Sequence, residues 1–223
     1  MLKTRTGRTL LTVAAIVTIA VVAVVLLVTR PDASSQAVVN TGPAALVRDD
    51  SHRLDESADA PVQVVEFLDF ECEGCRAVYP IVEQLRAEYG DRVEFVVRYF
   101  PMAGHFNAER AARAVEAAAQ QGQLKPMYHR MFETQSHWGE QRIPADGVFR
   151  AFAEELGLDL PAFDAAYTDP ATLQRIRLDQ QDGRALGVQG TPTFFVNGEQ
   201  IRLRSADDLR EAIESAYARS GSG

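Results

Sequence analysis

The chain has 223 residues, and its formal net charge is -8 at pH 7. This length suits one domain with appendages, and an apolar content of 46% is enough for a sizeable core. The acidic balance argues against nucleic acid as a partner, because phosphate binding needs clustered Lys and Arg, and the sequence has no long basic run.

The first 30 residues predict a short cytoplasmic stub and a transmembrane anchor. Residues 10–28 run without a charge, and as a helix they would be about 28 Å long, close to the hydrocarbon thickness of a bilayer. Lys3, Arg5 and Arg8 precede them and favour a cytoplasmic N-terminus. A cleaved signal peptide is the alternative, although its apolar core is usually shorter. Either interpretation puts the body of the protein outside the cytoplasm, where disulfides persist.

The region after the apolar segment combines a linker with the start of a sheet. Residues 31–60 are rich in Ala, Ser and Asp and predict a tether, with a possible short edge strand near 45–48. A β-branched run at 62–67 and another at 93–100 flank a helical pattern that ends at Gly90. Strand, helix and strand at this spacing predict a βαβ unit with parallel strands.

A long helical stretch follows the second strand. The expected helices cover 107–121, 124–135, 148–157, a short piece around 162–167, and a segment from Pro170 toward Leu186. A hairpin with an Asn197-Gly198 turn is then expected at 191–203. The last helix begins at a capping-box-like Ser205 and Asp208, and its apolar face comprises Leu209, Ile213 and Tyr217. Residues 220–223 are expected to form a tail.

The chain has only two cysteines, Cys72 and Cys75, and three uses compete for them. A zinc site needs about four ligands, and there is no second Cys pair and no paired spacing among the histidines, which are His52, His105, His129 and His137. A structural disulfide across about four residues gains only about 2 kcal/mol in the chain-entropy model. A reversible redox pair fits best, because the pair follows a strand and opens a helix downstream of an export segment.

The position of each cysteine predicts its role. Cys72 is expected at the helix N-terminus, where free N–H groups and the helix dipole favour an anion. The thiolate is the attacking form of cysteine, so Cys72 is the expected nucleophile. Cys75 lies one turn inside the helix and can resolve a mixed disulfide formed at Cys72.

Three features carry a resemblance to a known family. They are "APVQVVEFLDFECEGC" at 60–75, Pro80 five residues after Cys75, and "GVQGTPTFFVNG" at 187–198. From about residue 45 to 217 the chain resembles a membrane-anchored DsbA-like thiol:disulfide oxidoreductase of the thioredoxin superfamily. The resemblance implies an α/β thioredoxin fold at 61–219 with a DsbA-like helical insertion at about 106–187, preceded by one transmembrane helix. It implies no cofactor and no metal.

The resemblance also implies roles for residues around the cysteines. Pro192 matches a cis-proline that aligns substrate backbone, and Thr191 would lie beside the thiols. Glu66 matches a buried acid that passes protons to and from Cys75, with a half-exposed strand glutamate as the alternative. Asp69 is expected to be a loop or turn acid.

Two further features are harder to interpret. Relatives often have Pro between the cysteines, whereas this chain has Glu73-Gly74, so the motif does not reveal the redox potential. Glu73, Gly74 and Arg76 are the expected tuning residues. Trp138 is expected to pack in the helical insertion, with a substrate-groove contact as the alternative.

These features predict an extracytoplasmic dithiol oxidase that forms disulfides in exported, cysteine-containing proteins. The resemblance implies reoxidation by a quinone-linked membrane partner of the DsbB or vitamin-K-epoxide-reductase type. The alternatives are an envelope thiol reductase, or a chaperone or binding module on the same fold with a structural disulfide, since a fold does not fix a function. We expect a monomer, because residues 31–60 are too short and too polar to form a dimerisation domain.

Overall fold

The structure is a computed structural model, and it describes residues 44–221 except 56 and 58. The predicted transmembrane segment at 10–28 lies outside the described residues, as does the first part of the predicted tether. Within the described part, no helix has both the length and the apolar character needed to cross a membrane.

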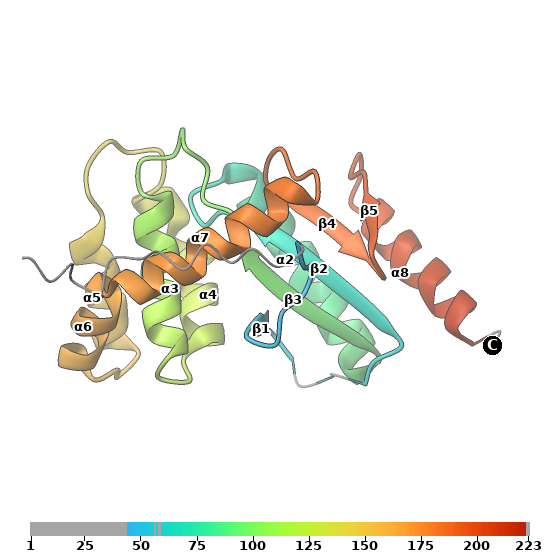
Figure 1. Cartoon of the computed structure of the whole chain (residues 1–223), viewed down its shortest axis with the longest axis horizontal. Coiled ribbons are helices and arrows are strands. Elements are labelled where there is room, and N and C mark those ends of the chain that lie inside the picture. The colour runs from blue at the N-terminus through green and yellow to red at the C-terminus, as the bar shows by residue number, and fades with distance from the viewer. Residues whose placement is uncertain (1–43, 56, 58, 222–223) are drawn as a thin grey trace, which may run out of the picture. The chain divides into compact units, whose positions relative to one another are not determined.

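The described residues fold around a five-stranded sheet in the order β1-β3-β2-β4-β5 (Figure 1). The two central strands, β2 (Val62–Leu68) and β3 (Val93–Tyr99), are parallel, which confirms the predicted βαβ pairing. The strands β1 (His52–Arg53), β4 (Thr193–Val196) and β5 (Glu199–Ile201) join by antiparallel pairing. The turn between β4 and β5 is Asn197-Gly198, as predicted, and both of its residues have positive φ, which is typical of a primed hairpin turn.

One face of the sheet packs against α2 (Glu73–Tyr89) and α8 (Asp207–Ser220). Alternate residues of β2 point to this face, so Val64 and Leu68 join one core with Val82 and Leu85 of α2. Glu66 falls on the same alternation and is therefore directed into this core. The short 3-10 turn η1 (Gly90–Arg92) connects α2 to β3.

The other face packs against α7 (Pro170–Ala185), which runs from the helical insertion toward the sheet (Figure 1). Gly183 of α7 lies directly on the rings of Phe67 and Phe100, and a Cβ at this position would be 2.8 Å and 2.9 Å from their carbons. Such distances are shorter than carbon atoms tolerate, so only glycine lets α7 approach this closely.

The helical insertion lies between β3 and β4. Besides α7 it contains α3 (Ala108–Ala119), α4 (Leu124–Thr134), η2 (Gln135–His137), α5 (Asp146–Glu155) and α6 (Leu160–Thr168). Trp138 is 2% exposed, and its ring packs edge-on against Phe149 at 4.8 Å. It therefore packs in the insertion, as expected.

Two details differ from the sequence prediction. The edge strand is His52–Arg53 rather than 45–48, and the packed unit starts before residue 61, because the buried Arg98 guanidinium donates to the carbonyl oxygens of Ala45 and Leu46. The last helix buries Ala216 instead of Tyr217, which is 41% exposed. The buried stripe of α8 is narrow, so one position along the helix moves a side chain out of it.

Candidate active site

Cys72 occupies the junction between β2 and α2. It is the N-cap of α2, with φ -70° and ψ 122°, so the helix begins at the next residue and the thiol lies at the positive end of the helix dipole. Its N–H donates to the Asp69 carbonyl oxygen at 3.1 Å, and its own carbonyl accepts from the N–H of Arg76 at 3.1 Å. The predicted position of Cys72 at the helix N-terminus is therefore the one observed.

Cys75 lies one turn further on and is fully buried. Its Sγ accepts a hydrogen bond from the N–H of Asp69 at 3.5 Å. Both cysteines are free thiols in this structure. A reagent from solvent meets Cys72, which is 8% exposed, before it can meet Cys75.

The surroundings move the pKa values of the two thiols in opposite directions. The hydrogen bond from Cys75, supported by Thr191 and by the N–H groups of Cys75 and Gly74, lowers the pKa of Cys72 to about 5, although burial opposes this. Burial raises the pKa of Cys75 well above its usual value, and the hydrogen bond to Cys72 and the charge of Glu66 raise it further. At neutral pH the reduced pair therefore holds one thiolate, on Cys72, and one proton, on Cys75.

The loop before β4 closes the site from the other side. The Thr191–Pro192 peptide is cis, and in the thiol form Cys72 donates to the Thr191 carbonyl oxygen at 3.3 Å. A Cβ at Gly74 would lie 3.2 Å from the Pro192 Cδ and 3.5 Å from the Cys72 Sγ. The small residue between the cysteines thus lets α2 pack tightly against the proline loop.

Glu66 lies in β2 on the face that carries the cysteine helix. It is 4% exposed, so the half-exposed alternative is excluded. Burial raises its pKa to about 8, and the nearby Cys72 and Glu83 add to the rise. A carboxyl group with such a pKa keeps its proton at neutral pH and can exchange it near pH 8.

Comparison with known proteins gives the family. The family model described as thioredoxin matches residues 57–215. The chain belongs to this thioredoxin family.

Solved structures extend the comparison. This thioredoxin-family chain is similar to a thioredoxin-like oxidoreductase from Silicibacter pomeroyi, with 26% identity, a TM-score of 0.66, and coverage of 78% of this chain and 96% of that one. It shares the fold of oxidised BdbD from Bacillus subtilis, with 23% identity, a TM-score of 0.66, and coverage of 75% and 93%. The predicted thioredoxin fold of the DsbA-like type is confirmed.

A curated relative with a similar sequence is named as an antiporter and not as an oxidoreductase. The Na(+)/H(+) antiporter NhaA of Herminiimonas arsenicoxydans is 38% identical over 152 residues, which are 68% of this chain but 23% of that protein. The chain therefore spans about a quarter of the length of the curated relatives it matches.

The predicted tuning residues lie at the surface of this thioredoxin-family site. Glu73, Gly74 and Arg76 are all exposed on the first turn of α2. Neither charged side chain is among the main causes of the low Cys72 pKa. Cys75, Thr191 and the backbone of the first turn are the groups that lower the pKa of Cys72.

Sequence reasoning missed three polar residues that hold the cysteine loop. Asp69 was expected to be a loop acid and does lie in the loop, but it is 2% exposed and its Oδ2 accepts from the N–H of Met102 at 2.9 Å and lies 2.6 Å from Nδ1 of His105. Gln135 donates its Nε2–H to the carbonyl oxygens of Phe70 and Cys72 at 2.7 and 2.9 Å.

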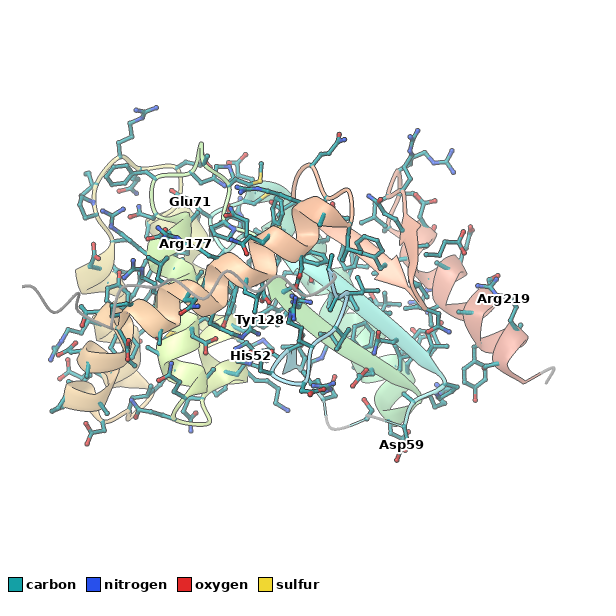
Figure 2. The ribbon with its side chains drawn as sticks, viewed as in Figure 1. His52, Asp59, Glu71, Tyr128, Arg177 and Arg219 are labelled. Carbon is teal, nitrogen blue, oxygen red and sulfur yellow. The ribbon has the colours of Figure 1, made fainter. Side chains whose placement is uncertain are left out.

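The third residue, Glu71, directly precedes Cys72 and is 1% exposed. Its carboxylate accepts from the N–H of Asn107 at 2.5 Å and of Glu140 at 3.1 Å. Figure 2 labels Glu71 near the start of α3, where the N-cap residue Asn107 donates to its carboxylate. The only signal in the sequence was the presence of acids in an otherwise apolar stretch, because the partners of these side chains outside the cysteine loop all lie more than 30 residues away.

Proposed function

We propose that this chain is an extracytoplasmic dithiol oxidase that introduces disulfides into exported proteins. The observation that carries the proposal is the separation of the two thiol pKa values, with Cys72 at about 5 and Cys75 well above its usual value. A disulfide oxidises other thiols when its reduced form is stabilised. A stable thiolate on Cys72 stabilises the reduced form and makes Cys72 a good leaving group.

The site supports a two-step exchange. A substrate thiolate attacks Cys72 of the Cys72–Cys75 disulfide, the S–S bond breaks, and Cys75 leaves and takes a proton from the carboxyl group of Glu66. A second substrate thiolate then attacks the substrate sulfur of the mixed disulfide, and Cys72 leaves as a thiolate. The substrate loses two electrons and gains a disulfide, and the cysteine pair gains the two electrons.

The cis-proline loop supports the proposed binding of substrate. Thr191 and Pro192 lie across Cys72 from α2, so a substrate that reaches Cys72 must pass along this loop. An open hollow of about 460 Å³ adjoins the loop and is lined by Gln189, Gly190, Thr191, Pro192 and other residues. It provides backbone groups against which an extended substrate chain can lie.

The proposed location rests on the sequence. The uncharged segment at 10–28 and the basic residues before it favour a single-pass anchor with the catalytic domain outside. A monomer anchored in this way would be reoxidised by a quinone-linked membrane partner of the DsbB or vitamin-K-epoxide-reductase type. The match to a portion of proteins named as antiporters is compatible with a membrane setting.

The test is the reduction potential of the purified full-length chain, measured by equilibration with glutathione, together with oxidation of a reduced, unfolded model substrate. We expect a potential less negative than about -270 mV, the value of thioredoxin, and net formation of substrate disulfides. A potential near or below that value without net oxidation would favour the reductase. Retention of full activity in the Cys72→Ser, Cys75→Ser double variant would instead favour a chaperone or binding module.

A further inference from the structure

A histidine and a buried carboxylate form a pair beside the two cysteines. Nδ1 of His105 and Oδ2 of Asp69 are 2.6 Å apart. The backbone of Asp69 contacts both cysteines, since its N–H donates to the Cys75 Sγ and its carbonyl accepts from the N–H of Cys72. The pair is thus attached to the redox centre through a single residue.

The geometry fixes the histidine but leaves it accessible to protons. Asp69 is itself held by the N–H groups of Glu71 and Met102, at 2.8 and 2.9 Å, so the carboxylate cannot turn away. The His105 side chain is 25% exposed. The imidazole therefore has one ring nitrogen bound to Asp69 and can exchange protons with solvent.

The charged groups around His105 are acidic, and one of them changes with the redox state. Asp69, Cys72 and Glu140 act on His105, and His105 acts on the carboxylate of Glu71. The three carboxylates come from the β2–α2 loop and from the loop before α5, and neither cysteine is charged in the disulfide. Only reduction adds a negative charge, on Cys72.

We propose that His105, positioned by Asp69, takes up a proton when the Cys72–Cys75 disulfide is reduced, and thereby stabilises the reduced pair. When two substrate thiols become a disulfide, they release two protons and two electrons. The cysteine pair takes both electrons, Cys75 takes one proton, and the imidazole of His105 takes the other and becomes imidazolium beside the Cys72 thiolate. The inference rests on thiol–disulfide exchange at this pair, but it does not depend on the direction of exchange in the cell.

The acidity of His105 agrees with this assignment. Burial by itself lowers the pKa of His105, but the hydrogen bond and charge of Asp69, with the charges of Cys72 and Glu140, raise it above the usual value. Because an interaction between two titrating groups is mutual, the imidazolium also favours the Cys72 thiolate. Removing the thiolate by forming the disulfide must lower the pKa of His105.

The decisive experiment is an NMR titration of the histidine rings in the full-length chain, once reduced and once oxidised. The signal of His105 is identified by its absence in His105→Asn. We expect the pKa of His105 to be higher in the reduced protein by about half a unit or more, as for a charge at several ångströms in a partly screened site. His137, which is exposed, serves as the control and should titrate at the same pH in both states.

Three variants test whether His105 affects the reduction potential of the cysteine pair. In His105→Asn, the amide can still donate to Asp69 in place of Nδ1, but it cannot be charged. We expect this variant to have a more negative reduction potential than the wild type and to take up fewer protons on reduction near neutral pH. His137→Gln should match the wild type. Glu66→Gln should keep the shift of His105, because its own proton exchanges near pH 8.

Identical titration of His105 in both redox states would overturn the inference, and so would an equal shift at His137. Neither result depends on whether a variant folds, because both are measured on the wild-type chain. A reduction potential as low as thioredoxin's, together with a redox-dependent pKa of His105, would refute the proposed oxidase direction and leave this inference standing. An oxidising potential without a redox-dependent pKa of His105 would support the oxidase direction and refute this inference.

Discussion

Two buried carboxyl groups flank the cysteine pair, and their surroundings differ. Glu66 lies on the strand face beneath α2, in the apolar core, a region we call the floor of the site. Asp69 lies in the loop beside Cys72, a region we call the rim, with two backbone N–H groups and His105 around its carboxylate. Burial raises the pKa of both groups.

The difference lies in what opposes the effect of burial. At the rim, hydrogen bonds from Met102, Glu71 and His105 all lower the pKa of Asp69. At the floor, the charges of Cys72 and Glu83 raise the pKa of Glu66 further. A buried carboxylate without donors keeps its proton, whereas one with donors can hold a cation. The floor is thus suited to donating a proton to Cys75, and the rim to supporting charge near Cys72.

The largest expected effect is a difference in reactivity between Cys72, at the rim, and Cys75, which lies toward the floor. In brief alkylation of the reduced protein at neutral pH, Cys72 should react at least about 100-fold faster than Cys75, because only Cys72 is a thiolate there. The rate at Cys72 should fall as the pH drops through about 5, the pKa of this thiol. Peptide mapping by mass spectrometry measures both rates, and faster labelling of Cys75 would contradict the assignment.

Serine variants should show that Cys72 and Cys75 have different roles in thiol–disulfide exchange. Cys72→Ser should reduce exchange to the uncatalysed background. Cys75→Ser should accumulate mixed disulfides through Cys72, because the resolving thiol is gone. Non-reducing gels with an oxidised partner detect these adducts, and their absence would count against Cys75 as the resolving residue.

Glu66→Gln tests the floor. We expect exchange to slow by roughly 10- to 100-fold, because general acid–base catalysis at Cys75 is lost. The variant should also be more stable than the wild type at neutral pH. In the unfolded chain Glu66 ionises near 4.5, whereas in the folded protein it keeps its proton until about 8.

The pH dependence of that stability has a definite sign. Below pH 4.5 both states of the wild type are protonated and Glu66 costs nothing. As the pH rises from 4.5 to about 8, ionisation favours the unfolded state by an amount on the order of 4 kcal/mol. The gain from Glu66→Gln in urea unfolding should therefore grow over this range. An unchanged exchange rate with a lower unfolding midpoint would show that Glu66 is structural.

Glu71→Ala tests how the rim is attached to the helical insertion. The change leaves the N–H groups of Asn107 and Glu140 without their acceptor. A buried unsatisfied N–H costs about 1–3 kcal/mol, and Glu140 is exposed enough for water to replace the lost acceptor. The N–H of Asn107 is then the one left unsatisfied, and we expect a loss of about 1–3 kcal/mol in the free energy of unfolding, measured in urea.

A matched control is Glu211→Ala on the exposed side of α8, which should change stability by less than about 0.5 kcal/mol. Glu71→Gln keeps one acceptor oxygen and should give an intermediate loss. Equal stability of all three variants would mean that Glu71 does not hold the insertion to the cysteine loop.

The floor and the position of Cys72 could largely be predicted from the sequence, and the polar contacts of the rim could not. The strand at 62–67 and the helix after it have clear periodicities, so the N-cap position of Cys72 follows from local pattern alone. The resemblance added Pro192 and the buried Glu66, because both lie inside its quoted motifs. These predictions needed only residues close together in the chain or a motif that covers them.

The rim depends on side chains that meet across long stretches of sequence. Asp69 and His105 are 36 residues apart, as are Glu71 and Asn107, and Gln135 is 65 residues from Phe70. Polar contacts between distant residues leave no periodic pattern in the sequence from which they could be predicted. The early start of the packed unit was hidden for the same reason, although Arg98 within an apolar strand was a signal, since a buried Arg needs partners.

The smallest expected effect concerns the two exposed charges beside Cys72. A charge about 7 Å away in a water-like dielectric changes the free energy of a thiolate by about 0.6 kcal/mol, which is under half a pKa unit. Glu73→Gln should therefore lower the pKa of Cys72 slightly, and Arg76→Gln should raise it slightly. Absorbance of the thiolate at about 240 nm measures both shifts, and both should shrink in 1 M salt because exposed charges are screened. A salt-independent shift of more than about one unit would show direct contact with the thiolate. It would then add the exposed turn of α2 to the floor and the rim as a third determinant of the Cys72 pKa.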